Sequence, residues 1–210
     1  MASSVLLKSL RRRLIERLSF FEEASNSSRV YLVDVRTVPR SLHQPQFNKT
    51  SLPQSSKKAG LGYVHMRGLD GLRHATRDSI KTGWRNASFR GYADYMQTPE
   101  FDKSLEKLIQ LANQDRIALM CAEAVPWRCH RSLIADALLV RGIRTEDIMS
   151  PTRRQVHTLT PFARVRRTTI TYPSEHLQGA QKKSPAKRSR SQRVRKPSRR
   201  QRPSLATFFG

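Results

Sequence analysis

The stretch that decides the fold is IALMCAEAVPWRCHRSLIADAL, residues 117–138. It opens as a short apolar run, which predicts a buried strand. It closes as an amphipathic helix with Leu133, Ala137 and Leu138 on one stripe. The turn between the two carries most of the reactive side chains: Cys121, Glu123, Cys129, His130 and Arg131. Open α/β sheets bind their ligands where a strand ends in a polar loop before a helix, so the sequence predicts a functional site in this turn.

Two earlier stretches follow the same pattern. Residues 30–33, VYLV, read as a buried strand that runs into Asp34 and Arg36, and residues 62–66 read as a strand that contains His65. The carboxyl ends of parallel strands meet at one edge of a sheet, so these polar residues should lie near the central turn. The residues predicted to bind a substrate or an anion are Asp34, Arg36, Arg40, His65 and Arg131.

The residues predicted to be catalytic are Cys121, Glu123 and His130. A thiol near arginines and a helix N-terminus has a lowered pKa and is a nucleophile, and Glu123 or His130 would then move protons. Structural interpretations stay open beside this one. Cysteine at a strand end is often a small buried apolar residue, and Asp34 and Arg36 are able to pair with each other.

Two sharper chemical templates fit poorly. A phosphatase loop needs arginine six positions after the cysteine, and Trp127 stands there. A zinc site would use Cys121, Cys129, His130 and His65, but the two cysteines are eight positions apart, cysteine and histidine are adjacent, and there is no C-x-x-C. We therefore expect no metal and no cofactor, and a redox pair of the two cysteines stays open as an alternative.

The central turn also carries a family resemblance. The pattern C-A-E-x-x-P-x-x-C-H-R-S-L-I-A, from Cys121 to Ala135, resembles the signature of the domain of unknown function 488 family. The patterns D-V-R-x-x-P-R-S at 34–41 and P-x-F-N at 45–48 match as well, and the likeness extends over roughly residues 30–173. The resemblance implies an α/β fold and no settled chemistry.

The N-terminus departs from that family, whose members usually open with a strand that carries a Gly-His-Ser turn. Residues 4–23 contain no such turn and read as an amphipathic helix, because Leu6, Leu10 and Leu14 recur at helical spacing. We therefore expect residues 1–29 to form a helix and a loop, with the first strand missing. Further helices are predicted at residues 52–59, about 92–96 and 99–112, with an irregular segment at 74–91 and a last short strand at 148–149.

The formal net charge is +24, and residues 174–210 hold 11 basic residues against one acid, which gives +10. Such a chain suits a polyanion, with nucleic acid ahead of an acidic membrane. No apolar run approaches the ~18 residues of a membrane span, and no secretory signal is recognised, so no membrane partner is expected. Two cysteines are too few for a disulfide framework and favour a reducing compartment.

Residues 174–203 are too polar to offset their ordering entropy and should be disordered. Their basic clusters are typical of a nuclear localisation signal or a segment that contacts the DNA backbone. The residues predicted to bind nucleic acid are Lys182, Lys183, Lys187, Arg188 and Arg190. The last peptide, residues 204–210, resembles a degenerate binding box for the sliding clamp, proliferating cell nuclear antigen (PCNA). Leu205, Phe208 and Phe209 fit its hydrophobic part, and Arg202 occupies the glutamine position.

The predicted fold is a single three-layer α/β domain with a mainly parallel sheet, Rossmann-like or flavodoxin-like, at residues 30–173, plus a disordered basic tail. The first functional hypothesis is a nuclear, DNA-associated accessory protein of replication or repair with a thiol-containing pocket. The second is an enzyme of a small phosphorylated or nucleotide-like metabolite, located in the nucleus or the cytoplasm, with the tail as a targeting signal. The third is a non-catalytic nucleic-acid-binding module. The sequence predicts no oligomeric state.

Overall fold

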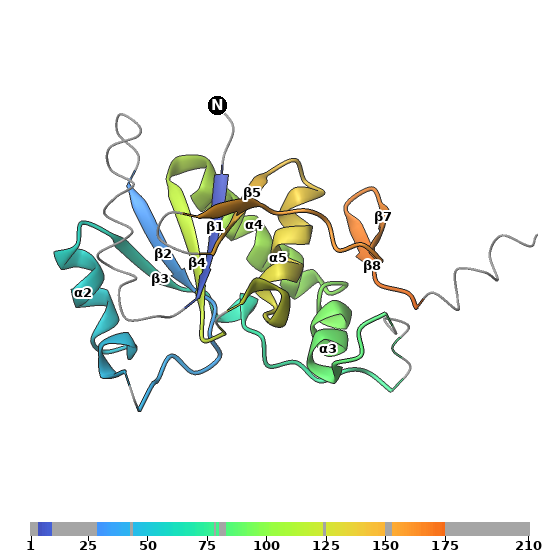
Figure 1. Ribbon diagram of the computed structural model, residues 1–210, viewed down its shortest axis with the longest axis horizontal. Coiled ribbons are helices and arrows are strands. Elements are labelled where there is room, and N and C mark those ends of the chain that lie inside the picture. The colour runs from blue at the N-terminus through green and yellow to red at the C-terminus, as the bar shows by residue number, and fades with distance from the viewer. Residues whose placement is uncertain are drawn as a thin grey trace, which may run out of the picture.

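A mixed sheet with the strand order β3-β2-β4-β1-β5-β6 forms the centre of the computed structural model (Figure 1). The structure describes residues 4–9, 29–42, 44–77, 79, 83–123, 125–149 and 153–174, and residues 4–9 by their backbone alone. The strands of this sheet are β1 (Ser4–Ser9), β2 (Val30–Asp34), β3 (Gly62–His65), β4 (Arg116–Cys121), β5 (Arg144–Ile148) and β6 (Arg154–Val156). The first five pair in parallel, and β6 pairs with β5 in the antiparallel sense.

Both faces of the sheet are covered by other parts of the chain. Alternate side chains of a buried strand point to opposite faces, so each such strand contributes to two cores. Along β4, Ile117, Leu119 and Cys121 join the core on one face, whereas Ala118 and Met120 join the core on the other. The three-layer α/β fold with a mainly parallel sheet is therefore confirmed.

The first core packs against three helices, α3 (Ala87–Tyr95), α4 (Pro99–Gln114) and α5 (Arg131–Leu139), and the second packs against α2 (Leu52–Lys58). The best-specified helix is α4. Its N-cap Thr98 accepts a hydrogen bond from the backbone N–H of Phe101, and Pro99 stands at a position where the missing N–H costs nothing. Its buried stripe runs Phe101, Leu105, Leu108 and Ala112, at helical spacing. The helices predicted at 52–59 and 99–112 are confirmed.

The helix α3 begins earlier than the sequence suggested. It starts at Ala87, inside a segment predicted to be irregular, because the side chain of Asn86 accepts a hydrogen bond from the backbone N–H of Ser88 and caps the helix. Phe89 and Tyr92 then point into the core. Both aromatic residues, which lie close to Arg90 in the sequence, are therefore core residues.

The prediction of a helix at the N-terminus is wrong for residues 4–9, which form β1 in the middle of the sheet. β1 pairs in parallel with β4, with Val5 opposite Ile117 and Ser9 opposite Cys121, and also with β5. A strand between two neighbours makes backbone hydrogen bonds along both edges, and this tertiary gain outweighs a helical spacing of leucines. The first strand, expected to be missing, is present, and the rest of the predicted helix lies outside the described residues.

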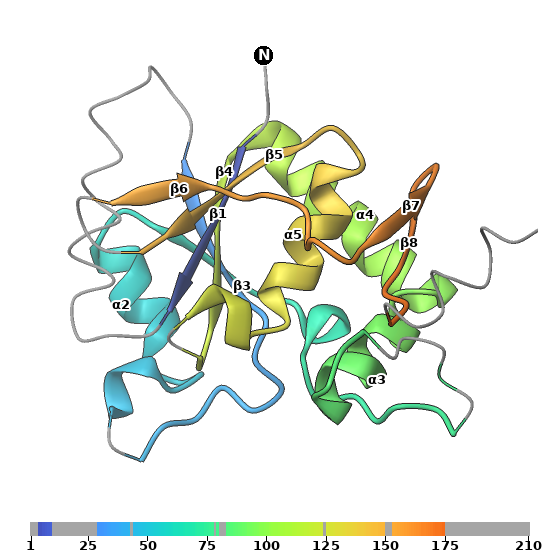
Figure 2. The same ribbon diagram turned by 45° about the vertical axis from the view of Figure 1, so that its right-hand side comes forward.

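The C-terminal part of the domain covers α5. A hairpin of β7 (Arg164–Arg166) and β8 (Thr169–Thr171) lies beside α4 and α5 (Figure 2). Ile170 and Tyr172 are buried in the core around α5, and the side-chain amide of Gln97 donates to the carbonyl of Ile170 at 2.9 Å. As a result α5 is buried on nearly every face. None of the helices that the structure describes is both long enough and apolar enough to cross a membrane.

Candidate functional site

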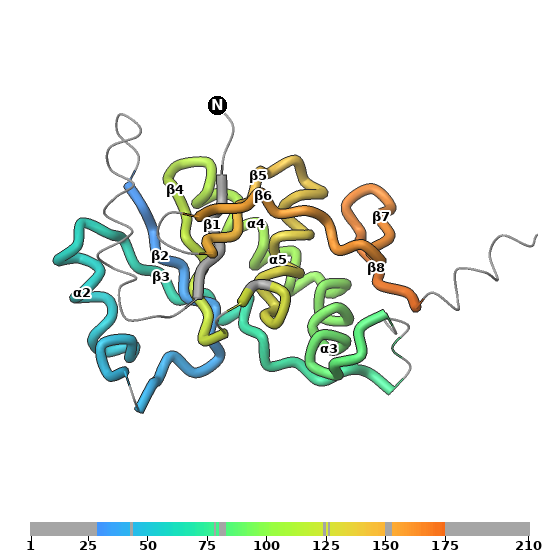
Figure 3. The backbone as a smooth tube through the Cα atoms, viewed as in Figure 1, coloured from blue at the N-terminus to red at the C-terminus, as the bar shows by residue number. Residues whose placement is uncertain are grey.

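A pocket of about 360 Å³ lies at the carboxyl ends of β2 and β4. Figure 3 follows the backbone from β4 to α5. Residues between these two elements, and not α5 itself, line one side of the pocket. The wall opposite comes from the residues after β2 and from the start of α3. The lining residues are Arg36, Thr37, Val38, Gly71, Leu72, Asn86, Ser88, Phe89, Cys121, Ala122, Glu123, Arg128, Cys129 and His130. The three residues predicted to be catalytic therefore lie in one pocket, at the expected edge of the sheet.

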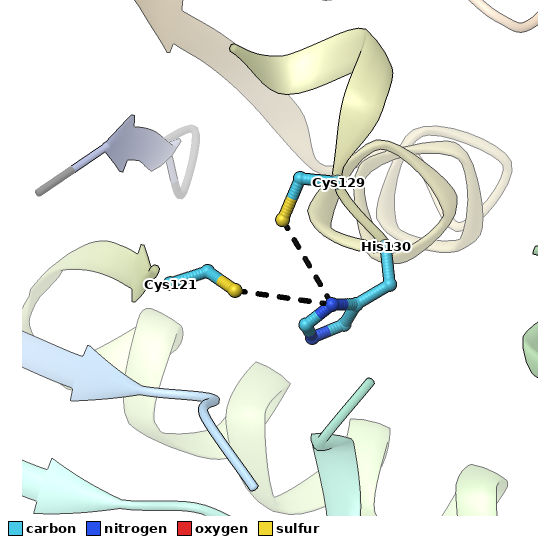
Figure 4. Close-up of side chains that lie close together, drawn as sticks. All are labelled: Cys121, Cys129 and His130. Carbon is cyan, nitrogen blue, oxygen red and sulfur yellow. Dashed lines mark hydrogen bonds between the residues drawn. The ribbon is translucent and has the colours of Figure 1, made fainter. Parts of the chain in front are cut away.

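Two thiols and one imidazole face each other in this pocket (Figure 4). The Nδ1 atom of His130 lies 4.0 Å from Sγ of Cys121 and 3.8 Å from Sγ of Cys129. A 3-10 turn, η4 (Pro126–Arg128), reverses the chain between the two cysteines, so that their side chains meet although they are eight positions apart. Both thiols are free, and the exposed fractions of Cys121 and Cys129 are 6% and 1%. We call this group the dithiol–imidazole centre.

The negative charge of the centre belongs on Cys129. A hydrogen bond from the Cys121 thiol is the main cause that lowers the pKa of Cys129, and His130 and Arg131 lower it as well, so that together they outweigh the effect of burial. The same hydrogen bond, together with burial, raises the pKa of Cys121. The two pKa values therefore move in opposite directions, because the two sulfur atoms share one hydrogen bond. The sequence pointed to Cys121 as the nucleophile, and the electrostatics point to its neighbour.

Arg131 takes a different place from the one predicted for an anion-binding residue. Its side chain is fully buried and does not line the pocket. Its Nε donates to Sγ of Cys129 at 3.2 Å, and its Nη2 donates to the carbonyl of Glu123 at 2.7 Å. A buried guanidinium needs a nearby anion, and the thiolate of Cys129 supplies it. Arg131 therefore fixes both the charge of the centre and the shape of the turn.

The end of β2 and the residue that follows Val35 form a buried ion pair beside the pocket. The Nε and Nη2 atoms of Arg36 donate to the two carboxylate oxygens of Asp34 at 2.8 and 2.6 Å, and Nη2 also donates to the carbonyl of Phe47 at 2.8 Å. The hydroxyl of Tyr63 donates to Asp34 at 3.0 Å, and burial followed by the charge of Asp34 raises the pKa of Tyr63. Such a bidentate pair holds the loop in place beside the pocket.

The other residues predicted to bind an anion offer no free charged group to the pocket. Arg36 lines it, but its guanidinium is committed to Asp34. His65 contacts the carbonyl of Arg36 through Nε2 at 2.9 Å, and Arg40 is exposed; neither lines the pocket. The guanidinium that sequence reasoning left out of the site is that of Arg128, which is exposed and lines the pocket. The sequence could have indicated this role, because Arg128 immediately precedes Cys129.

The profile of the family described as "Domain of unknown function DUF488" matches residues 16–138, more than half of the chain. The chain belongs to this family. No curated protein and no solved structure matches it. The matched part contains β2 to α5 and hence the whole lining of the pocket, whereas β1 and the strands from β5 onward lie outside the match.

Four buried side-chain nitrogen atoms lack a hydrogen-bond partner in the described part of the chain, and two of the four lie next to each other at the start of α5. These two are Nε2 of His130 and Nη1 of Arg131. Buried polar atoms in native proteins are nearly always paired, and exceptions concentrate where a ligand, an ion or ordered water completes a site. The two unpaired atoms at the start of α5 are therefore consistent with a binding site. Glu123 and Arg128, both exposed on the pocket lining, offer it a hydrogen-bond acceptor and a donor.

A second charged cluster stands behind α5. His157 contacts Asp136 through Nε2 at 3.0 Å and Asp147 through Nδ1 at 3.3 Å, and Asp136 also accepts from the hydroxyl of Tyr172 at 2.9 Å. Burial alone would lower the pKa of His157, but the hydrogen bonds to the two carboxylates outweigh it and raise the pKa to about 9. No sequence pattern pointed to this cluster, because its members are spread over α5, β5 and the segments after β6 and β8.

Proposed function

We propose that this DUF488 protein is a nuclear, DNA-associated enzyme that acts on a small phosphorylated or nucleotide-like substrate. The observation that carries the proposal is the dithiol–imidazole centre inside a pocket at the carboxyl edge of a parallel sheet. Ligands of open α/β sheets bind at this edge, and a strongly perturbed pKa in a cleft marks a functional site more often than a structural one. The pKa of Cys129 is perturbed in this way.

The pocket favours an anion of modest size. Its volume of about 360 Å³ is at the small end of the range for ligand sites. Arg128 offers a guanidinium for a phosphate, and Asn86 and Ser88 offer shorter polar groups. Val38, Leu72 and Phe89 supply apolar surface on the same lining, which suits a nucleoside or another flat organic group better than a bare ion.

The basic tail supports the DNA-associated part of the proposal. Residues 174–210 carry a net charge of +10, which is enough for sequence-independent contact with phosphates. The alternative of a non-catalytic binding module rested on a missing first strand. β1 occupies that position in the sheet, so the missing strand no longer argues for a vestigial pocket, although the Gly-His-Ser turn is absent from residues 4–23.

Binding of nucleoside monophosphates and inorganic phosphate to the full-length protein tests the pocket. A ligand at about a hundred times its Kd should raise the unfolding free energy by about 3 kcal/mol, which a thermal-shift assay detects. Arg128→Gln should weaken binding about tenfold, because it removes one charge-assisted hydrogen bond. The matched control is Arg166→Gln, which removes the same charge from the β7–β8 hairpin. Equal affinity in both variants, or no ligand for the unaltered chain, would overturn the proposal.

The tail is tested by the salt dependence of DNA binding. If roughly six residues neutralise phosphates, the logarithm of the binding constant should fall against the logarithm of the salt concentration with a slope of about −5. Truncation after Pro173 should flatten this slope while the pocket ligand binds as before. A slope unchanged by truncation would place the DNA contact on the folded domain.

A further inference from the structure

We infer that Cys121, Cys129 and His130 bind a zinc ion whose fourth coordination position opens into the pocket. The inference deepens the proposed function, since the ion would lie in the proposed substrate pocket. It does not need a substrate, however, because the three ligands belong to the protein. Spacing along the chain argued against such a site, and the folded arrangement of the three side chains reverses that argument.

The distances suit a tetrahedral ion. Zinc lies about 2.3 Å from a thiolate sulfur and about 2.0 Å from an imidazole nitrogen, so a tetrahedral site separates sulfur from nitrogen by about 3.6 Å. The two observed separations from Nδ1 of His130 are 4.0 Å to Cys121 and 3.8 Å to Cys129. All three ligand atoms lie within 4.8 Å of one another. Small side-chain movements would bring the set to ideal geometry without a change in the backbone.

The turn between β4 and α5 explains how adjacent residues both reach the ion. The chain turns sharply where Cys129 leads into α5, and the side chains of Cys129 and His130 therefore both point back toward the end of β4 (Figure 4). The turn η4 returns the chain to Cys121. An adjacent cysteine and histidine are awkward ligands in an extended segment, but not at such a bend.

The ligand set selects the ion. Two thiolates and one imidazole are soft and borderline ligands, which favour zinc over magnesium or calcium. The surroundings already support a thiolate, since Nε of the buried Arg131 donates to Sγ of Cys129 at 3.2 Å. Hydrogen bonds of this kind to ligand atoms orient the ligands and tune the metal.

Three protein ligands leave one position for water, as in catalytic rather than structural zinc sites. All three ligands line the pocket, and so does Glu123. The chemistry that fits is hydrolysis. A zinc ion held there would activate a bound water as the nucleophile. The carboxylate of Glu123, on the same lining, would accept the proton of that water and return it to the leaving group, which would depart with the electron pair of the broken bond.

The metal content of the full-length protein, purified without a histidine tag, tests the inference. We expect about one zinc ion per chain by inductively coupled plasma mass spectrometry, with retention against a competing chromophoric chelator. Replacement by cobalt should give a thiolate-to-metal charge-transfer band and the intense visible bands of a tetrahedral site. His130→Ala should weaken zinc binding more than the tenfold to hundredfold that loss of an outer partner costs. His74→Ala, at an exposed histidine, should leave zinc binding unchanged.

Two results would overturn the inference. One is a folded protein without stoichiometric zinc and without the cobalt–thiolate band. The other is zinc that a weak chelator removes as readily as it removes adventitious zinc from the surface. Variants of the three ligand residues are prone to misfold. If they do not fold, the cobalt spectrum of the unaltered chain decides whether the zinc site exists. Zinc binding without any nucleotide binding would leave the zinc site standing and defeat the proposed substrate. Nucleotide binding without zinc would defeat the zinc site and leave the proposed substrate standing.

Discussion

Replacing His157 by glutamine should change how the stability of the domain depends on pH. His157 is buried between Asp136 and Asp147, and its pKa in the folded protein is raised from 6.5 to about 9. A group whose pKa is higher in the folded state stabilises that state when it is protonated. The contribution is complete below the unfolded value of 6.5 and is lost as the pH rises through about 9.

The size of the contribution follows from the shift. One pKa unit corresponds to about 1.4 kcal/mol, so the shift from 6.5 to about 9 sets an upper value of roughly 3 kcal/mol. His157 also lines a second cavity, of about 290 Å³, between α5 and the segment after β6. Solvent in that cavity screens the two ion pairs, and about 2 kcal/mol is the value we expect.

Urea unfolding of the wild-type protein and of His157→Gln, at about pH 6 and at about pH 10, measures this contribution. The wild-type unfolding free energy should fall by about 2 kcal/mol more than that of the variant between the two pH values. Other titrating groups are common to both proteins and cancel in the difference. His74→Gln, at an exposed histidine, should behave as the wild type does. If His157→Gln loses as much stability as the wild type, His157 is not protonated in the folded protein and the reasoning fails.

Three further predictions concern separate parts of the chain. Tyr63→Phe removes the hydroxyl that donates to the buried aspartate of β2 and should lower the unfolding free energy by about 1 kcal/mol in urea titrations. Thr98→Ala removes the N-cap of α4 and should also cost about 1 kcal/mol, measured in the same way. A peptide of residues 196–210 should bind the sliding clamp with a Kd on the order of micromolar or weaker, and replacing Phe208 and Phe209 by alanine should abolish the calorimetric heat.

The sequence was sufficient for three of the parallel strands. Residues 30–33 and 117–121 are short apolar runs that lie in the buried strands β2 and β4, and the strand predicted at 62–66 is found as the half-buried edge strand β3, which ends at His65. It was not sufficient for β1, because a strand in the middle of a sheet is selected by its neighbours and not by its own periodicity. Its partners, β4 and β5, lie more than a hundred positions further along the chain.

The candidate site was predicted in its location but not in its internal roles. Cys121, Glu123 and His130 line one pocket because a strand, a turn and a helix follow each other in a few residues. The role of an arginine depends on whether it is buried, which is a property of the whole fold. Arg131 and Arg128 are three positions apart, yet one is fully buried and the other is exposed.

Arg131 explains why the centre keeps its form without a ligand. A guanidinium with no exposed surface would be costly unless an anion lay beside it, and Cys129 is that anion. The second bond of Arg131, to the carbonyl of Glu123, closes the turn that brings Cys121 and Cys129 together. The fold therefore stabilises a thiolate in the pocket before any substrate or ion arrives. A site preorganised in this way can take up a zinc ion with little rearrangement, because the two sulfur atoms and the imidazole nitrogen already lie within 4.8 Å of one another.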